Sequence, residues 1–153
     1  MPCITRNQAF KRMNALYKTG AIDWVSLQPK INEAKQIITE SINKSDNPVV
    51  AFSGGKDSIV VLDLVRSINP NVQGAFCNTG NEYPETIKFV ETVDNVVWLN
   101  PVKTFWQCVK EYGMPVMKSK SKSHGNRCCN YLKEKPAINY YKENDVDLVF
   151  TGL

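Results

Sequence analysis

The sequence lacks the features of a membrane or secreted protein. Its 153 residues contain no run of about eighteen apolar residues, and the first residues show no basic stretch followed by an apolar region. We therefore expect neither a membrane span nor a secretory signal, and we expect a cytoplasmic protein. The length is enough for one sizeable core and too short for two ordinary domains.

Residues that ligate metals are scarce, which argues against a zinc site built from this chain alone. The sequence has one histidine, His124, and five cysteines, none of them in a C-x-x-C pair. An odd number of cysteines in a chain of expected cytoplasmic location also argues against a disulfide framework. The informative cysteine feature is the adjacent pair Cys128 and Cys129.

A strong excess of one charge is also absent. The formal net charge is +4, and part of it comes from Lys118, Lys120 and Lys122, with Arg127 close behind. This pattern indicates a local site for an anionic ligand more than a surface that coats a polyanion. The charge permits nucleic-acid binding without requiring it.

What the sequence does contain is an alternation of short apolar runs with longer amphipathic ones. Helical periodicity predicts one helix over 9–17 and a second after Pro29, both within residues 1–47 and packed on the flank of a domain that residues 48–153 form. In that domain we expect strands at 49–52, 72–77, 96–99 and 147–150, and helices at 59–68, 84–93, 104–112 and 133–144. This alternation predicts an α/β fold in which helices cover both faces of a parallel sheet.

The first expected strand ends in a glycine-rich loop with the properties of a phosphate site. The loop consists of Ser53, Gly54, Gly55, Lys56, Asp57 and Ser58. Its glycines let backbone amides approach an anion closely, and the N-terminus of the following helix adds positive potential. Lys56 adds a mobile cation, the two serines offer hydroxyl donors, and Asp57 can cap the helix or hold a magnesium ion. The strand, loop and helix together predict a phosphate-binding loop.

This loop is not a Walker A sequence, because that pattern needs glycine at Val50 and serine or threonine at Asp57. It resembles, residue for residue, the SGGxDS signature of the PP-loop adenine nucleotide alpha hydrolases. That family includes ATP pyrophosphatases, the small subunit of ATP sulfurylase, and the reductases of adenylyl sulfate and phosphoadenylyl sulfate (PAPS). The resemblance implies a Rossmann-like fold with strand order 3-2-1-4 and a loop that binds phosphate or pyrophosphate groups.

Two further loops at expected strand ends support this interpretation. The segment from Thr79 to Thr86 resembles the "TG-x-E-x-P-E-T" segment of the sulfonucleotide reductase branch, and Thr151 with Gly152 follows the last strand. The resemblance implies that Thr79, Gly80, Thr151 and Gly152 lie beside the base or ribose. In a doubly wound parallel sheet, ligands bind at the carboxyl ends of the strands where the strand order reverses. We therefore expect all three loops to open on one edge.

The stretches around Trp106 and Gly113 resemble the same branch's "TFW" and "YG-x-P" elements. Phe105, Trp106 and Val109 have helical spacing within an amphipathic segment. We expect these three side chains in the core and not in base stacking.

The residues from Arg127 to Pro136 resemble the "CC-x-x-x-K-x-x-P" element of adenylyl sulfate reductases and archaeal relatives. There the cysteine pair joins a later C-x-x-C to hold a four-iron cluster, which makes Cys128 and Cys129 candidate iron–sulfur ligands. The later pair and the carboxy-terminal catalytic cysteine are absent from this sequence, so two half-buried structural thiols remain an equal alternative. Arg127 and Lys133 are expected near a sulfate or phosphate.

Three functions stay open on the sequence. The first is a sulfonucleotide reductase that releases sulfite from adenylyl sulfate or PAPS with a thioredoxin-like reductant. The second is a magnesium-dependent ATP pyrophosphatase that adenylates an acceptor, for example for a sulfur-transfer partner acting on nucleic acid. The third is a nucleotide-binding module without turnover. Family members continue past the position of Leu153, so we expect a truncated or split member, whose oligomeric state the sequence leaves open.

Overall fold

A computed structural model describes residues 15, 18–20, 24–115 and 125–152, and its centre is a four-stranded parallel sheet. The strands are β1 (Pro48–Ala51), β2 (Gln73–Cys77), β3 (Val96–Leu99) and β4 (Leu148–Phe150). The helices are α2 (Trp24–Ile42), α3 (Lys56–Arg66), α4 (Pro84–Val90), α5 (Phe105–Tyr112), α6 (Gly125–Cys129), the π-helix η1 (Asn130–Glu134) and α7 (Lys135–Glu143). The sheet order is β3-β2-β1-β4, which confirms the expected 3-2-1-4 arrangement.

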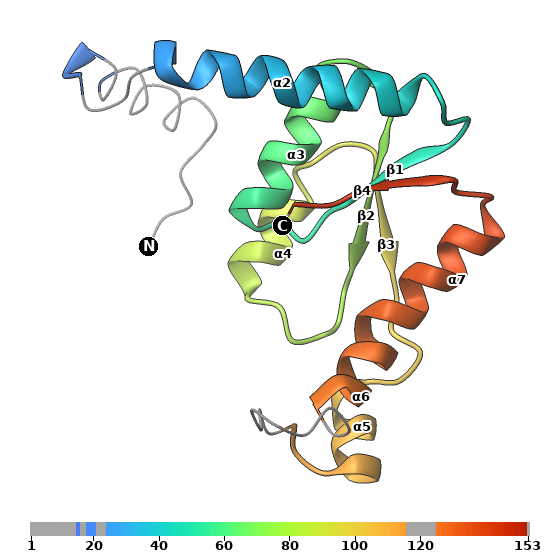
Figure 1. The fold of residues 1–153 in the computed structure, drawn as a ribbon. Coiled ribbons are helices and arrows are strands. Elements are labelled where there is room, and N and C mark those ends of the chain that lie inside the picture. The colour runs from blue at the N-terminus through green and yellow to red at the C-terminus, as the bar shows by residue number, and fades with distance from the viewer. Residues whose placement is uncertain (1–14, 16–17, 21–23, 116–124, 153) are drawn as a thin grey trace.

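Successive residues of β1 face opposite sides of the sheet, as the two-residue period of a strand requires. Val50 points toward α3 and is fully buried in a cluster with Leu62, Val65 and Phe76. Ile38 of α2 joins the same cluster, and Figure 1 shows α2, α3 and α4 on this side of the sheet. The α2 helix therefore contributes a side chain to the same core cluster as α3.

The opposite face of the sheet carries a smaller hydrophobic cluster. Val49, Ala75 and Leu99 form a smaller buried cluster, against which Ala137 and Tyr141 of α7 pack. In Figure 1, α7 is the helix beside this face, and α5 and α6 lie at the end of the molecule away from α2. Because small side chains line the sheet here, space remains between α7 and the strand ends.

Asp147, just before β4, forms hydrogen bonds with the turn that leads into β1. Its carboxylate accepts hydrogen bonds from the Ser45 hydroxyl and from the backbone amides of Asp46 and Asn47, the last two at 2.8 and 3.1 Å. These bonds hold the pKa of Asp147 below its ordinary value of 3.8. The amino ends of β1 and β4 are therefore joined by side-chain contacts as well as by the parallel ladder.

Several expected helix boundaries shift in the structure. The α2 helix begins before Pro29 and contains it, whereas the sequence places this helix after that proline. The segment expected as one helix over 133–144 is helical from Gly125 and passes through a π-helical turn, a feature that apolar periodicity does not reveal. The expected helix among residues 9–17 lies outside the described residues apart from Ala15. In the described part of the chain, no helix is long and apolar enough to cross a membrane.

Trp106 is the clearest wrong prediction. Its side chain is 71% exposed, and the buried residue of α5 is instead Cys108. The helix begins as expected, because Thr104 accepts a hydrogen bond from the Gln107 amide and the Gln107 side chain accepts one from the Thr104 amide. The apolar spacing therefore predicts the helix correctly but not the face that it buries.

Candidate functional site

The phosphate loop is held in shape by a hydrogen-bond hub on Ser58. The Ser58 hydroxyl donates to the Gly55 carbonyl at 2.9 Å and accepts bonds from the Ser53 amide and the Ser53 hydroxyl at 3.2 and 3.1 Å. Ser58 is 5% exposed. In this structure its hydroxyl therefore serves the loop itself, whereas the sequence suggests a donor for the ligand.

Gly54 is required by both its backbone and its neighbours. Its φ is +72°, a conformation in which other residues are strained. A Cβ atom at this position would lie 3.0 Å from the Thr86 methyl and 3.1 Å from a Val90 methyl. The phosphate loop thus packs closely against α4, the helix that follows the second loop.

The first turn of α3 carries the exposed charges of the loop. Gly55 is the N-cap and no side chain caps the helix, so the expectation that Asp57 caps it is wrong. Asp57 lies in the first turn, where it complements the helix dipole, and its carboxylate is 3.5 Å from the Lys56 ammonium. The two side chains are 64% and 91% exposed, respectively, so both are accessible to a bound ligand.

Gly152 brings the loop after β4 against the same turn of α3. A Cβ atom on Gly152 would lie 2.9 Å from the Asp57 carbonyl carbon and 3.1 Å from the Ser58 nitrogen. Only glycine permits this approach, because the neighbouring atoms are backbone. The loops after β1 and β4 therefore meet, as the strand order predicts, and Figure 1 shows the chain ending beside the start of α3.

The second loop, after β2, is closed by its own side chains. The hydroxyl of Thr79, which is 4% exposed, donates to the Glu82 carboxylate at 2.7 Å and accepts from the Asn81 amide at 3.2 Å. Gly80 has a φ of +79° and is exposed. The side chain of Thr79 therefore shapes the loop, and the exposed backbone at Gly80 is the part that faces outward.

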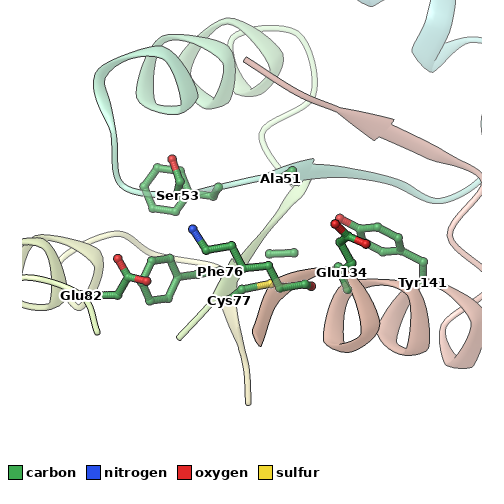
Figure 2. A pocket seen from close by; sticks show the side chains of 11 residues that line it. Ala51, Ser53, Phe76, Cys77, Glu82, Glu134 and Tyr141 are labelled. Atoms are coloured by element: carbon green, nitrogen blue, oxygen red, sulfur yellow. The ribbon is translucent and has the colours of Figure 1, made fainter. Parts of the chain in front are cut away.

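A cavity of about 280 Å³ lies between the ends of β1 and β2 and the helix α7. Three alanines make room for it, one each from β1, β2 and α7: Ala51, Ala75 and Ala137. Ser53 of the phosphate loop lies at one side, and Cys77, Glu82 and Tyr141 line the rest (Figure 2). The cavity therefore opens directly beside the predicted phosphate site.

Lys133 also lines this cavity, as an anion-binding role would require. The Cys77 thiol donates to the Lys133 carbonyl at 3.5 Å. Burial raises the pKa of the Cys77 thiol above its ordinary value, an effect that Lys133 opposes and Glu82 reinforces. The thiol in the cavity is consequently protonated and a weak nucleophile near neutral pH.

Arg127, in contrast, is not among the cavity residues. Its guanidinium lies over the Tyr112 ring, 5.4 Å from the ring centre. Tyr112 stacks on Tyr131, with ring centres 5.9 Å apart and planes inclined by 7°. Arg127 and Lys133 therefore belong to different surroundings, although the sequence groups them as one anion site.

Among the described residues, no further ligands accompany the cysteine pair to complete a four-iron cluster. Cys128 is half-buried and Cys129 is exposed, and burial followed by the neighbouring Cys128 raises the pKa of Cys129. Among residues 24–115 and 125–152, no group of three or more histidine, cysteine, aspartate or glutamate side chains is placed to hold a metal ion. A four-iron cluster needs four ligands, so the described residues do not fit it.

Sequence reasoning missed most of the cavity wall. Cys77, Glu82, Glu134 and Tyr141 line the cavity, yet none belongs to the expected site. Cys77 and Glu82 could have been found, because they flank the loop that follows β2. Tyr141 could not, because only the packing of α7 brings it to the strand ends.

The parallel sheet with its glycine loop at the switch point defines an α/β, Rossmann-like fold. Residues 47–153 match the model of the phosphoadenosine phosphosulfate reductase domain. The chain therefore belongs to the PAPS reductase family.

Individual relatives agree with this assignment. An uncharacterised protein of Methanocaldococcus jannaschii is 35% identical over 124 residues, which cover 76% of this chain and 25% of that protein. An adenosine 5′-phosphosulfate reductase of Lysinibacillus sphaericus is 29% identical over 67% of this chain and 46% of its own length. The chain thus spans between a quarter and about half the length of these relatives.

The fold has a solved counterpart. The crystal structure of PAPS reductase from Candida auris, a phosphate complex, superposes with a TM-score of 0.59 at 20% sequence identity. The match covers 99% of this chain and 69% of that structure. At this identity the similarity supports the fold and no more.

Proposed function

We propose that this chain binds a sulfonucleotide, adenylyl sulfate or PAPS, at the carboxyl edge of the sheet and serves its reductive cleavage to sulfite. The observation that carries the proposal is that Ser53 belongs both to the phosphate loop and to the wall of the neighbouring cavity. One elongated ligand can therefore occupy the loop and the cavity together.

In this proposal the phosphate groups lie over the first turn of α3. Gly54, Gly55 and the first-turn amides donate to them, because the first amides of a helix have no partner within it. Lys56 adds a mobile charge from solvent. The adenosine occupies the alanine-lined cavity and the exposed backbone at Gly80, with Thr151 and Gly152 closing the other side.

Lys133 has the chemistry for the sulfate. A lysine at the cavity wall attracts an anionic group, and the family resemblance places a lysine at this position of the cysteine-pair element. The Lys133 side chain is exposed in the present structure, so it can reorient toward a ligand. Arg127, on the tyrosine stack, needs a larger movement to join it.

Sulfite release requires a nucleophilic thiol and a reductant. A thiolate attacks the sulfur, the sulfur–oxygen bond to the nucleotide phosphate breaks, and the nucleoside phosphate leaves. A second thiol then attacks the resulting S-sulfo group, which releases sulfite and leaves a disulfide. The protonated Cys77 is a poor candidate for the first thiol, so we assign this chain the binding step and leave both thiols to a thioredoxin-like dithiol partner.

A second candidate function is hydrolysis of ATP to release pyrophosphate. The observation that favours it is the pair of exposed charges on α3, because a lysine and a carboxylate suit a pyrophosphate with its magnesium ion. Asp57 would hold the magnesium ion, which would supply charge neutralisation at the phosphates.

Calorimetric titration with adenylyl sulfate, PAPS and ATP, with and without magnesium, tests the proposal. We expect the sulfonucleotides to bind without magnesium, and sulfite to appear when a dithiol is added. Magnesium-dependent pyrophosphate release from ATP with no sulfite from either sulfonucleotide would decide for the second function. Tight binding with neither product would indicate a module that binds without turnover.

Two variants test where the nucleotide binds. Ala137→Leu fills the cavity from α7 and should weaken nucleotide binding about tenfold or more, because the added side chain takes the place of the adenosine. Lys56→Ala should weaken the binding of the phosphates. The matched control is Lys44→Gln, an exposed lysine at the opposite end of β1, which should bind as the unaltered chain does. Equal affinity in all three variants would contradict the proposed location.

A further inference from the structure

The positive charge of the protein is concentrated in the connection between β3 and α7. Residues 101–135 hold eight lysines and arginines against two glutamates, whereas the remaining sequence holds eleven against thirteen. In the described part of this connection the cations are Lys103, Lys110, Arg127, Lys133 and Lys135. A basic segment on an otherwise slightly acidic chain is an electrostatic footprint for a polyanion.

Aromatic rings hold several of these cations in place. The Lys103 ammonium lies 4.5 Å from the centre of the Tyr131 ring, and Lys135 lies 4.3 Å from the same centre. Arg127 lies over Tyr112, the stacking partner of Tyr131. Glu111 pairs with Lys103, and Glu134 is the other acidic residue among residues 101–135, so the cluster keeps an excess of positive charge.

An exposed indole lies on α5, the helix that also carries Lys110 and Tyr112. Trp106 is 71% exposed, and Phe105 meets it edge to face with ring centres 5.3 Å apart. Lys110 follows Trp106 by one helical turn, so the two side chains neighbour each other on the surface of α5. Along the same helix a shallow groove of about 520 Å³ is lined by Val102, Lys103 and Gln107, among others.

We propose that the surface formed by Trp106, Lys110, Arg127 and the Tyr112–Tyr131 stack binds single-stranded nucleic acid. Bases stack on Trp106 and the backbone phosphates contact the cations, which is the combination that sequence-tolerant single-strand binding uses. A duplex is a poorer ligand, because its bases are already stacked on one another. A protein partner fits less well, since lysine is depleted in protein interfaces.

This surface is separate from the nucleotide cavity, and the inference does not depend on the proposed function. Neither Trp106 nor Arg127 is among the cavity residues, and Lys133 is the member of the basic segment that reaches the cavity. Since α5 is about 12 Å long, the site covers a short stretch of strand. We therefore expect weak binding, in the micromolar range, that depends strongly on salt.

Fluorescence anisotropy with a labelled, unphosphorylated single-stranded oligonucleotide of about 12 nucleotides tests the inference. At about 50 mM salt we expect saturable binding that weakens steeply by about 200 mM. Trp106→Ala should weaken binding about tenfold, and Trp106→Phe should restore most of it, because phenylalanine still stacks. Lys110→Gln and Arg127→Gln should each lower the salt slope by about 0.7, the contribution of one neutralised phosphate. Lys44→Gln is the matched control and should change nothing.

Four results would overturn the inference. The first is no binding up to about 1 mM oligonucleotide at low salt. The second is equal affinity in Trp106→Ala and the unaltered chain, with circular dichroism showing that both are folded. The third is complete displacement of the oligonucleotide by inorganic pyrophosphate together with loss of binding in Lys56→Ala, since both would place the strand on the phosphate loop. A duplex that binds as tightly as the single strand would also contradict the stacking geometry.

Discussion

The carboxyl edge of the sheet and the basic segment of residues 101–135 differ in how tightly their atoms pack. At the edge, Gly54 and Gly152 lie so close to neighbouring atoms that an added Cβ atom would be in close contact with them. On the basic segment, charged and aromatic side chains cover a surface on which Trp106 is mostly exposed. Close backbone packing leaves a recognisable residue pattern in the sequence, whereas a surface arrangement of long side chains does not.

Two tryptophans give the largest expected contrast between the regions. Trp98 packs edge to face on the buried Phe76, with ring centres 4.9 Å apart, so Trp98→Ala should lower the free energy of unfolding by about 3 kcal/mol. Trp106→Ala should change it by less than about 0.5 kcal/mol, because the side chain is exposed. Urea denaturation measures both values. Comparable losses of unfolding free energy in the two variants would contradict the difference in packing between the two tryptophans.

The next effect tests close packing at the phosphate loop. Gly54→Ala should cost about 2–3 kcal/mol, because the methyl group strains the backbone and meets Thr86 and Val90. The control Gly20→Ala has the same φ of +72° with no atom within 4 Å of the added Cβ, so it reports backbone strain alone. Urea denaturation of the two variants compares them. Equal losses would mean that the contacts with α4 contribute nothing.

A smaller effect is expected at the hydrogen-bond hub. Ser58→Ala removes a buried hydroxyl that serves three partners, and should lower the free energy of unfolding by about 1–2 kcal/mol while weakening nucleotide binding. Ser67→Ala, at the other end of α3, removes an exposed hydroxyl that donates to the Leu64 carbonyl, and should have little effect on either quantity. Thermal melts and calorimetry measure both. An unchanged nucleotide affinity in Ser58→Ala would show that the hub does not shape the site.

The smallest effect lies at the opposite edge, where Asp147 joins β4 to the turn before β1. Its folded pKa is lowered, so its stabilisation is complete above the ordinary value of 3.8 and is lost as the pH falls through the lower folded value. Asp147→Asn should therefore lower the Tm at pH 7. At pH values below the folded pKa of Asp147, the variant and the unaltered chain should have the same Tm. Asp63→Asn on α3 is the control. A difference that persists unchanged into strong acid would exclude the carboxylate charge as its cause.

Much of the fold can be predicted from the sequence. The four strands follow from apolar runs, and turn residues such as Ser53-Gly54-Gly55 report local backbone requirements, whereas the strand order follows from the family resemblance. The cavity wall at Tyr141 and the exposure of Trp106 could not be predicted, because both depend on how α7 and α5 pack in three dimensions. The roles of Ser58 and Thr79 are similar cases, since residue type alone does not tell a ligand donor from a loop-closing hydroxyl.

The central claim is that the loops after β1, β2 and β4 form one nucleotide site. Calorimetric titration of adenylyl sulfate into the unaltered chain and into Gly152→Val tests it most directly, because this substitution forces the third loop away from the backbone of Asp57. We predict binding in the micromolar range by the unaltered chain and a loss of about tenfold or more in a folded Gly152→Val variant. No binding by the unaltered chain at millimolar nucleotide, or equal affinity in the two proteins, would contradict the claim.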